Sequence, residues 1–243
     1  MVFSPCPIRG NNLTMTELSP FEIEALLLSL KVGVAATVFS LPFAVLVAWV
    51  LSRLRFPGKF LLDGITHLPL VLPPVVIGYV LLVLFGKNGP VGGWLYDVFG
   101  ITIAFTWKGA AVASAVVAFP LMVRAIRLSF DNVDIKLEQA ARTLGAKPVS
   151  IFFTITLPLI LPGLLSGAVL AFARSLGEFG ATITFVSNIP GVTQTLPLAL
   201  YSSIQSFDGE FIALRLVIIS VVLSLAAMLA SEFLSRKLAG YLE

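Results

Sequence analysis

Residues Ile23–Leu51 read IEALLLSLKVGVAATVFSLPFAVLVAWVL, and Glu24 and Lys31 are the only charged residues in this stretch. The 20 residues that follow Lys31 carry no charge at all. An α-helix needs about 20 residues to cross the roughly 30 Å of hydrocarbon in a bilayer. The stretch therefore predicts a membrane-spanning helix near 23–52.

The composition of the whole chain agrees with a membrane protein. Of its 243 residues, 58% are apolar and only 12% are charged. A soluble domain carries about 25% charged residues, so this chain has roughly half the charge that a soluble surface of its size needs. The composition therefore excludes a soluble globular enzyme.

Four more apolar stretches follow the first one. Because lipid offers no partner for unpaired backbone groups, each is expected to be helical rather than irregular. We predict an all-α, polytopic membrane protein with five transmembrane helices, near 23–52, 65–86, 105–127, 156–186 and 211–234.

The basic residues predict the orientation of these helices. If the N-terminus is outside and the C-terminus is cytoplasmic, ten basic residues lie on the cytoplasmic side of the membrane. Only two or three lie on the other side, namely Arg9, Lys87 and the boundary residue Lys108. This distribution follows the positive-inside rule. The ten are Arg53, Arg55, Lys59, Arg124, Arg127, Lys136, Arg142, Lys147, Arg236 and Lys237.

The chain is expected to form one membrane domain, 23–236, with a periplasmic N-terminal extension, 1–22, and a cytoplasmic tail, 237–243. Its longest loops are the cytoplasmic 128–155 and the outer 187–210. The outer loop carries acidic residues and no basic residue. This composition fits either a docking site for an external partner or an ordinary solvated loop. Met1–Pro20 does not have the pattern of a signal peptide.

The sequence carries no recognisable catalytic or metal-binding pattern. It has no G-x4-G-K-[S/T] loop for a nucleotide, no H-E-x-x-H motif and no G-x-S-x-G elbow. Its single histidine, His67, is expected to make a local contact with Asp63, four residues away, and its single cysteine, Cys6, has no expected role. We therefore predict no catalytic residue, no metal, no cofactor bound by this chain and no nucleic-acid partner.

The cytoplasmic loop contains a short predicted helix, Asp134–Pro148. Asp134 is a suitable N-cap, Gly145 a suitable left-handed residue at the C-terminus, and Pro148 fits the first turn of the next helix. An apolar stripe recurs at helical spacing along it, and so short a helix needs a surface to pack on. That surface is either the protein's own helix ends or a partner. The stripe consists of Leu137, Ala140, Ala141 and Leu144.

The same loop resembles the EAA loop of ABC-importer permeases, which has the form E-A-A-x3-G-x9-I-x-L-P. Gln139-Ala-Ala, Gly145 and Ile155-Thr-Leu-Pro158 match this spacing, although Gln139 stands at the acidic position and Glu138 precedes it. The resemblance implies a type I ABC-importer permease fold and a coupling helix that docks on a separate ATPase, where ATP and Mg are bound. The residues implied in coupling are Leu137, Glu138, Gln139, Ala140, Ala141, Arg142, Leu144 and Gly145.

Candidate residues for the transport path lie in the second and fourth predicted helices. Pro73 and Pro74 disrupt regular helix, either as a bend beside a cavity or as a structural kink. In the fourth helix, Arg174 and Glu178 can pair four residues apart, in the path or at the membrane boundary. The further path or gate candidates are Ser175, Phe179 and Gly180, and a ridge of Gly163, Gly167 and Ala171 is expected to pack closely on another helix.

Residues Phe172–Ile183, followed by Asn188-Ile-Pro-Gly191 and Thr195-Leu-Pro197, make the chain similar to the molybdate permeases of the molybdate/sulfate branch. The resemblance implies a homodimer in the bacterial inner membrane, with two cytoplasmic P-loop ATPases and a periplasmic molybdate-binding protein. It implies molybdate import by alternating access. Sulfate or tungstate transport by the same kind of permease, or an ATP-independent anion channel, are the alternatives.

Overall fold

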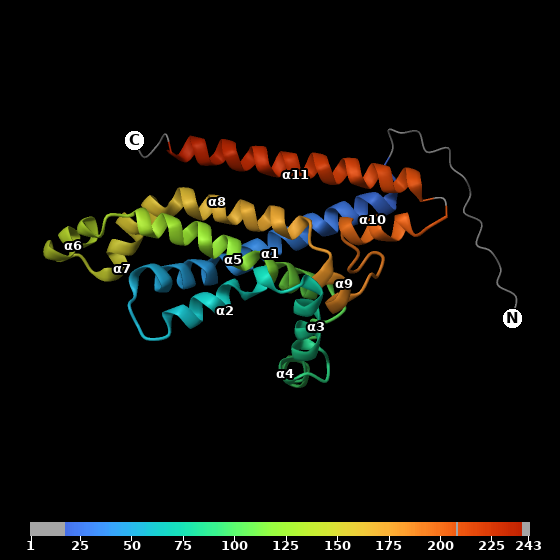
Figure 1. Ribbon diagram of the computed structural model, residues 1–243, viewed down its shortest axis with the longest axis horizontal. Coiled ribbons are helices and arrows are strands. Elements are labelled where there is room, and N and C mark those ends of the chain that lie inside the picture. Colours follow the sequence, from blue (N-terminus) through green and yellow to red (C-terminus); the bar gives the residue numbers. More distant parts are fainter. Residues whose placement is uncertain (1–17, 208, 240–243) are drawn as a thin grey trace, which may run out of the picture.

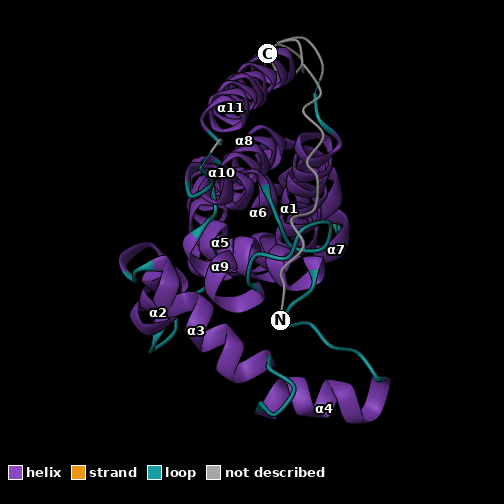
Figure 2. Cartoon of the chain, turned by 90° about the vertical axis from the view of Figure 1, so that its right-hand side faces the viewer, coloured by secondary structure: helices purple, strands orange, loops and turns teal. Residues whose placement is uncertain are grey.

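The computed structural model describes residues 18–207 and 209–239, and all the regular structure in these ranges is helical (Figure 2). The all-α class is therefore confirmed. The predicted extension, 1–22, and the predicted tail, 237–243, lie largely outside the described residues, so the division of the chain into these segments remains a prediction.

Four long helical segments run side by side along the molecule (Figure 1). Each of them is long and apolar enough to cross a membrane. They are α1 (Pro20–Arg53), α5 (Trp107–Asn132), α11 (Glu210–Ala239) and a continuous segment of α7 (Pro148–Ile151), the π-helical turn η1 (Phe152–Thr156) and α8 (Leu157–Leu176).

The predicted helix 65–86 is not one helix. Two helices, α2 (Lys59–Val71) and α3 (Pro74–Phe85), replace it and meet at an angle of 113°. Pro73 and Pro74 stand at the junction, where neither has an N–H to continue the helical hydrogen bonds. The described residues thus contain four straight spans, or five if this bent pair is one span.

The predicted helix 156–186 is also interrupted. It ends as α8 at Leu176 and resumes as α9 (Gly180–Val186), because Gly177 to Phe179 leave the helical path. Helix α5 is longer than predicted and continues to Asn132, which shortens the cytoplasmic loop. The remaining short helices are α4 (Pro90–Phe99), α6 (Ile135–Thr143) and α10 (Leu196–Ile204), of which only α6 was predicted.

The two ends of the bundle differ in what they carry (Figure 1). Helices α6 and α7 lie at one end, beside the last turn of α1, and α9 and α10 lie at the other, beside the first half of α1. We call these the inner and the outer end, following the orientation that the basic residues predict. Helices α3 and α4 project sideways from the bundle (Figures 1 and 2).

Small residues form the core between α1, α5 and α8. Ala44 and Ala48 of α1 are fully buried, and the glycine ridge of α8 faces α5. Gly163 lies against Ser129, and Gly167 lies against the backbone oxygen of Met122. Close approach of helix backbones is how membrane helices gain van der Waals contact, because lipid is as apolar as their side chains.

Large apolar side chains also cover much of the outside of the bundle. Phe39 and Leu46 of α1 and Val222 and Leu225 of α11 are all more than half exposed. A water-soluble protein does not display apolar surface of this extent, whereas a lipid-facing surface requires it.

Replacing Gly167 with valine tests the close packing of α8 on α5. A Cβ there would lie 3.1 Å from the Met122 oxygen and 3.2 Å from the Ile126 side chain. We expect a loss of about 1–3 kcal/mol of stability, measured as a lower midpoint of thermal unfolding in detergent.

The matched control is Gly64→Val in α2, where nothing lies within 4 Å of the added Cβ. Equal unfolding midpoints for the two variants would contradict close packing at Gly167.

Candidate functional site

Helix α6 has a well-defined start and end. Asp134 caps it, since its Oδ1 accepts a hydrogen bond from the Lys136 N–H at 2.9 Å. Gly145 ends the segment with φ +86°, the left-handed region that favours glycine, and Pro148 begins α7. The predicted N-cap, left-handed glycine and first-turn proline are confirmed.

The apolar stripe of α6 is not packed on the protein's own helix ends. None of the nine residues of α6 is buried, and the Leu144 side chain that follows them is 88% exposed. Of the predicted coupling residues, Leu137, Gln139, Ala140, Arg142, Leu144 and Gly145 are exposed, and Ala141 is half-buried. Three of the four stripe residues, Leu137, Ala140 and Leu144, are therefore exposed, as residues of a docking surface would be.

Glu138 points towards the bundle instead. Its Oε1 lies 3.0 Å from Nη2 of Arg53, the last residue of α1, and accepts a hydrogen bond from the Thr156 hydroxyl at 3.1 Å. The Arg53 and Glu138 side chains are only 12% and 14% exposed. Glu138 thus lies on a different face of α6 from the exposed Leu137 and Leu144, which its position in the motif did not reveal.

The two interrupted helices meet at their breaks, which forms a second candidate site. A Cβ on Gly180 would lie 2.9 Å from the Cβ of Pro74, and one on Gly78 would lie 2.9 Å from the Cβ of Thr184. Only glycine permits α3 and α9 to approach this closely. Pro74 and Gly180, which come from the two segments predicted to contribute to the transport path, are therefore in contact in the structure.

Glu178 organises the break between α8 and α9. Its side chain is only 1% exposed, its Oε2 lies 2.9 Å from Nη1 of Arg174, and its Oε1 accepts a hydrogen bond from the Ala181 N–H at 2.8 Å. The Thr182 hydroxyl lies 2.9 Å from the Phe179 carbonyl oxygen and 3.2 Å from that of Glu178. The backbone groups released by the break thus gain partners, as a buried break in a membrane helix requires.

The remaining path candidates surround this break. Ser175 is buried, and its hydroxyl donates a hydrogen bond to the Ala171 carbonyl oxygen within the same helix. The Phe179 ring packs on that of Tyr201 in α10, with the ring centroids 5.1 Å apart. Arg174 is 31% exposed and is the member of the charged pair that a small anion could reach.

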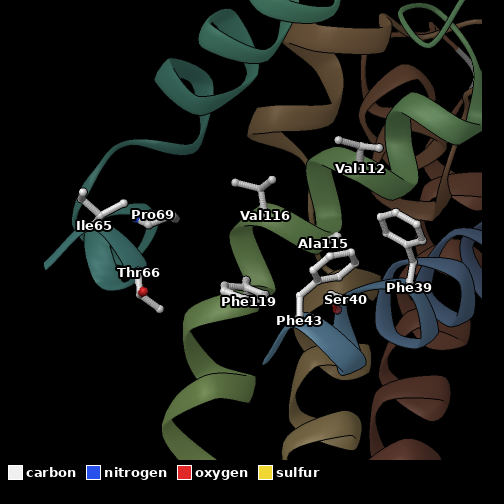
Figure 3. Close-up of a pocket in the computed structure, with 10 residues that line it drawn as sticks. All are labelled: Phe39, Ser40, Phe43, Ile65, Thr66, Pro69, Val112, Ala115, Val116 and Phe119. Carbon is white, nitrogen blue, oxygen red and sulfur yellow. The ribbon is translucent and has the colours of Figure 1, made fainter. Parts of the chain in front are cut away.

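A cavity of about 340 Å³ lies between α1, α2 and α5, near Pro69 (Figure 3). Phe39 and Phe43 form one wall, and Ile65 and Pro69 form the wall opposite (Figure 3). Almost all of its lining is apolar, so it does not suit a small oxyanion.

A more polar cavity, of about 690 Å³, lies between α2, α5 and α8. The His67 Nδ1 lies 2.9 Å from the Asp63 carbonyl oxygen and 3.4 Å from its Oδ1, so the predicted local contact is confirmed. Arg127 pairs with the same carboxylate at 2.8 Å. The sequence did not predict this pair, although both residues stand on the predicted inner side. The polar lining residues are Asp63, His67, Arg124, Arg127 and Asp131.

Residues that could hold a metal ion are not grouped in the described part of the chain. No three of its His, Cys, Asp or Glu side chains lie together as a metal site would require. The charged groups instead form pairs of opposite sign, such as Glu22 with Arg215 at 2.8 Å.

Replacing Glu178 with alanine tests its part in the α8–α9 break. The change removes the hydrogen bond to the Ala181 N–H and leaves Arg174 without its carboxylate, so we expect a loss of about 1–3 kcal/mol of stability. Thermal unfolding of the purified chain measures this loss.

Glu24→Ala is the control, because Glu24 is exposed and forms no hydrogen bond or ion pair among the described residues. If the two variants unfolded at the same temperature, Glu178 would not organise the break.

Comparison with known proteins identifies the family of this chain. The family described as "Binding-protein-dependent transport system inner membrane component" matches residues 40–240. The molybdenum transport system permease protein ModB of Escherichia coli (strain K12) is 64% identical over 215 residues, which cover 88% of this chain and 94% of ModB. The sulfate transport system permease protein CysT of the same strain is 40% identical over 190 residues, which cover 78% of this chain and 68% of CysT.

The fold agrees with this assignment. A crystal structure of a bacterial ABC transporter that imports the acidic polysaccharide alginate superimposes with a TM-score of 0.71, at 18% identity, and covers 90% of this chain and 80% of that one. The chain therefore belongs to the family of binding-protein-dependent transport system inner membrane components, and it is a multi-pass permease subunit of an ABC importer in the inner membrane.

Proposed function

We propose that this chain is the permease of an ATP-driven molybdate importer. The observation that carries the proposal is the 64% identity to a molybdenum permease over nearly its whole length, against 40% to a sulfate permease. Sulfate or tungstate transport is the alternative within the branch. An ATP-independent channel is a weaker alternative, because a channel has no use for the uncovered apolar surface of α6.

The ATPase is expected on a separate subunit that docks on α6. The chain has no phosphate-binding loop of its own, and the exposed Leu137 and Leu144 provide an apolar surface on a helix with well-defined ends. An amphipathic helix laid into a groove is a common mode of protein recognition. The partner would then bind ATP and Mg. Movement of the partner would be transmitted to this chain through the exposed face of α6.

Alternating access needs parts of the bundle that can rearrange without exposing backbone to lipid. The breaks at Pro73-Pro74 and at Gly177–Phe179 lie against each other, and polar side chains satisfy the groups released at the second one. We place the gate at this contact, with Arg174 as the group that meets the anion. The pair with Glu178 would keep that contact weak, as a path that must release its cargo requires.

A second copy of the chain is expected to complete the path. Helices α3 and α4 project from the bundle (Figure 2), and they expose Tyr79, Val83, Trp94 and Phe99. A homodimer would cover part of this surface, and a symmetric pair would place two gates around one axis. The periplasmic binding protein would dock at the outer end.

Replacing Leu144 with aspartate is expected to release the ATPase. A charge in an apolar contact costs several kcal/mol when it is desolvated, enough to lower affinity by more than about 100-fold. Co-purification of the ATPase with the tagged chain measures this binding.

Arg55→Asp serves as the control, because Arg55 is exposed beyond the end of α1 and forms no ion pair among the described residues. Retention of the ATPase by Leu144→Asp would exclude α6 as its docking site.

Molybdate, tungstate and sulfate can be compared directly in the reconstituted complex. With the binding protein loaded with each anion in turn, we expect ATP hydrolysis in proteoliposomes to be stimulated by molybdate and not by sulfate. Stimulation by sulfate alone would show that the molybdate assignment is wrong, and anion flux through this chain without ATPase or ATP would support a channel instead.

A further inference from the structure

Helix α6, on which the ATPase is proposed to dock, also contacts the last turn of α1. Besides its ion pair with Glu138, Arg53 places Nη2 3.5 Å from the Val133 carbonyl oxygen, and Thr156 of η1 donates to the same Glu138 oxygen. Arg53 of α1 and Thr156 of η1 therefore both contact the Glu138 carboxylate of α6. Glu138 also faces Arg53 and Thr156, and not the direction of Leu137 and Leu144, which are proposed to meet the ATPase.

This contact differs from an ordinary surface ion pair. Exposed pairs contribute little, because solvent screens them and the side chains lose entropy. The Arg53 and Glu138 side chains are mostly shielded, and loss of one partner from a shielded pair leaves the other charge without compensation. The contact should therefore keep α6 and the end of α1 together when either one moves.

The outer half of α1 is tied to other elements in the same way. The Ser29 hydroxyl accepts a hydrogen bond at 2.7 Å from the N–H of Leu196, the first residue of α10. Nearer the start of α1, the fully buried Glu22 pairs with Arg215 of α11 at 2.8 Å. The same helix thus holds α6 at the inner end and α10 and α11 at the outer end (Figure 1).

We propose that α1 is the rod that transmits movement between the ATPase and the outer surface, and that Arg53 and Glu138 are the positioning residues that connect it to α6. Helix α1 is continuous over 34 residues, a length of about 50 Å. It remains helical through Pro42. The inference rests on the proposed function, in which α6 receives the ATPase and the outer end receives the binding protein.

The experiment measures how far the loaded binding protein stimulates ATP hydrolysis by the whole complex in proteoliposomes, as the ratio of stimulated to basal rate. Glu138→Gln keeps the shape of the side chain and an oxygen for Thr156 but removes the charge. We expect this ratio to fall about five-fold or more, within the usual range of coupling between distant sites. Arg53→Met should lower the ratio similarly, and the double variant should be no worse than either single one.

Two further variants make the result specific. Arg55→Met, two residues beyond Arg53 and exposed, should leave the ratio unchanged. Ser29→Ala removes the acceptor for the Leu196 N–H at the outer end of the rod, and it should lower the ratio although it lies far from α6. Loss of folded complex lowers the basal and the stimulated rates together and leaves their ratio unchanged. A coupling defect lowers the ratio, and its effects should be non-additive between the contacting residues Arg53 and Glu138.

Stimulation like that of the wild type in both Glu138→Gln and Arg53→Met would overturn the inference. So would strictly additive effects, or loss of the ATPase from the Glu138→Gln complex, which would place Glu138 in the docking surface. Failure of the wild-type complex itself to bind an ATPase or to respond to the loaded binding protein would instead overturn the proposed function on which the inference rests.

Discussion

Hydrocarbon offers no hydrogen-bond partner to the backbone, and the arrangement of this protein depends on that constraint. It requires helices across the membrane and allows an interruption only where another group satisfies what the break releases. At the end of α8 the Glu178 carboxylate accepts from the Ala181 N–H, and the Thr182 hydroxyl lies within reach of two carbonyl oxygens. At the end of α2, Pro73 and Pro74 have no N–H to donate to the preceding turn, and the helix ends there. The two breaks lie where α3 and α9 pack on each other.

The second determinant is the size of the side chains between helices. Since lipid is as apolar as leucine, helix association depends on close contact rather than on burial of apolar area. Gly167 against α5 and Gly180 against Pro74 are sites where a side chain would hold the backbones apart. Small residues are consequently found where helices approach most closely, beside large buried side chains such as Phe130 and Phe185.

Several charged pairs in this protein connect different helices. Arg53 with Glu138, Glu22 with Arg215 and Asp63 with Arg127 each join two different helices. The chain has few charged residues, and these three pairs hold the helices together at the ends of the bundle.

The sequence alone determined the membrane class, the approximate limits of the long helices, the caps of α6 and the family motif. These follow from the thickness of a bilayer and from rules that act over a few residues, such as the capping by Asp134 and the left-handed conformation of Gly145. It predicted that Pro73 and Pro74 would disturb a helix, but not the 113° angle between the pieces. Only the tertiary structure decided the partner of each charge, the contact between the two breaks and the inward direction of Glu138. The physical reason is that these depend on distances between residues such as 53 and 138, which no local pattern encodes.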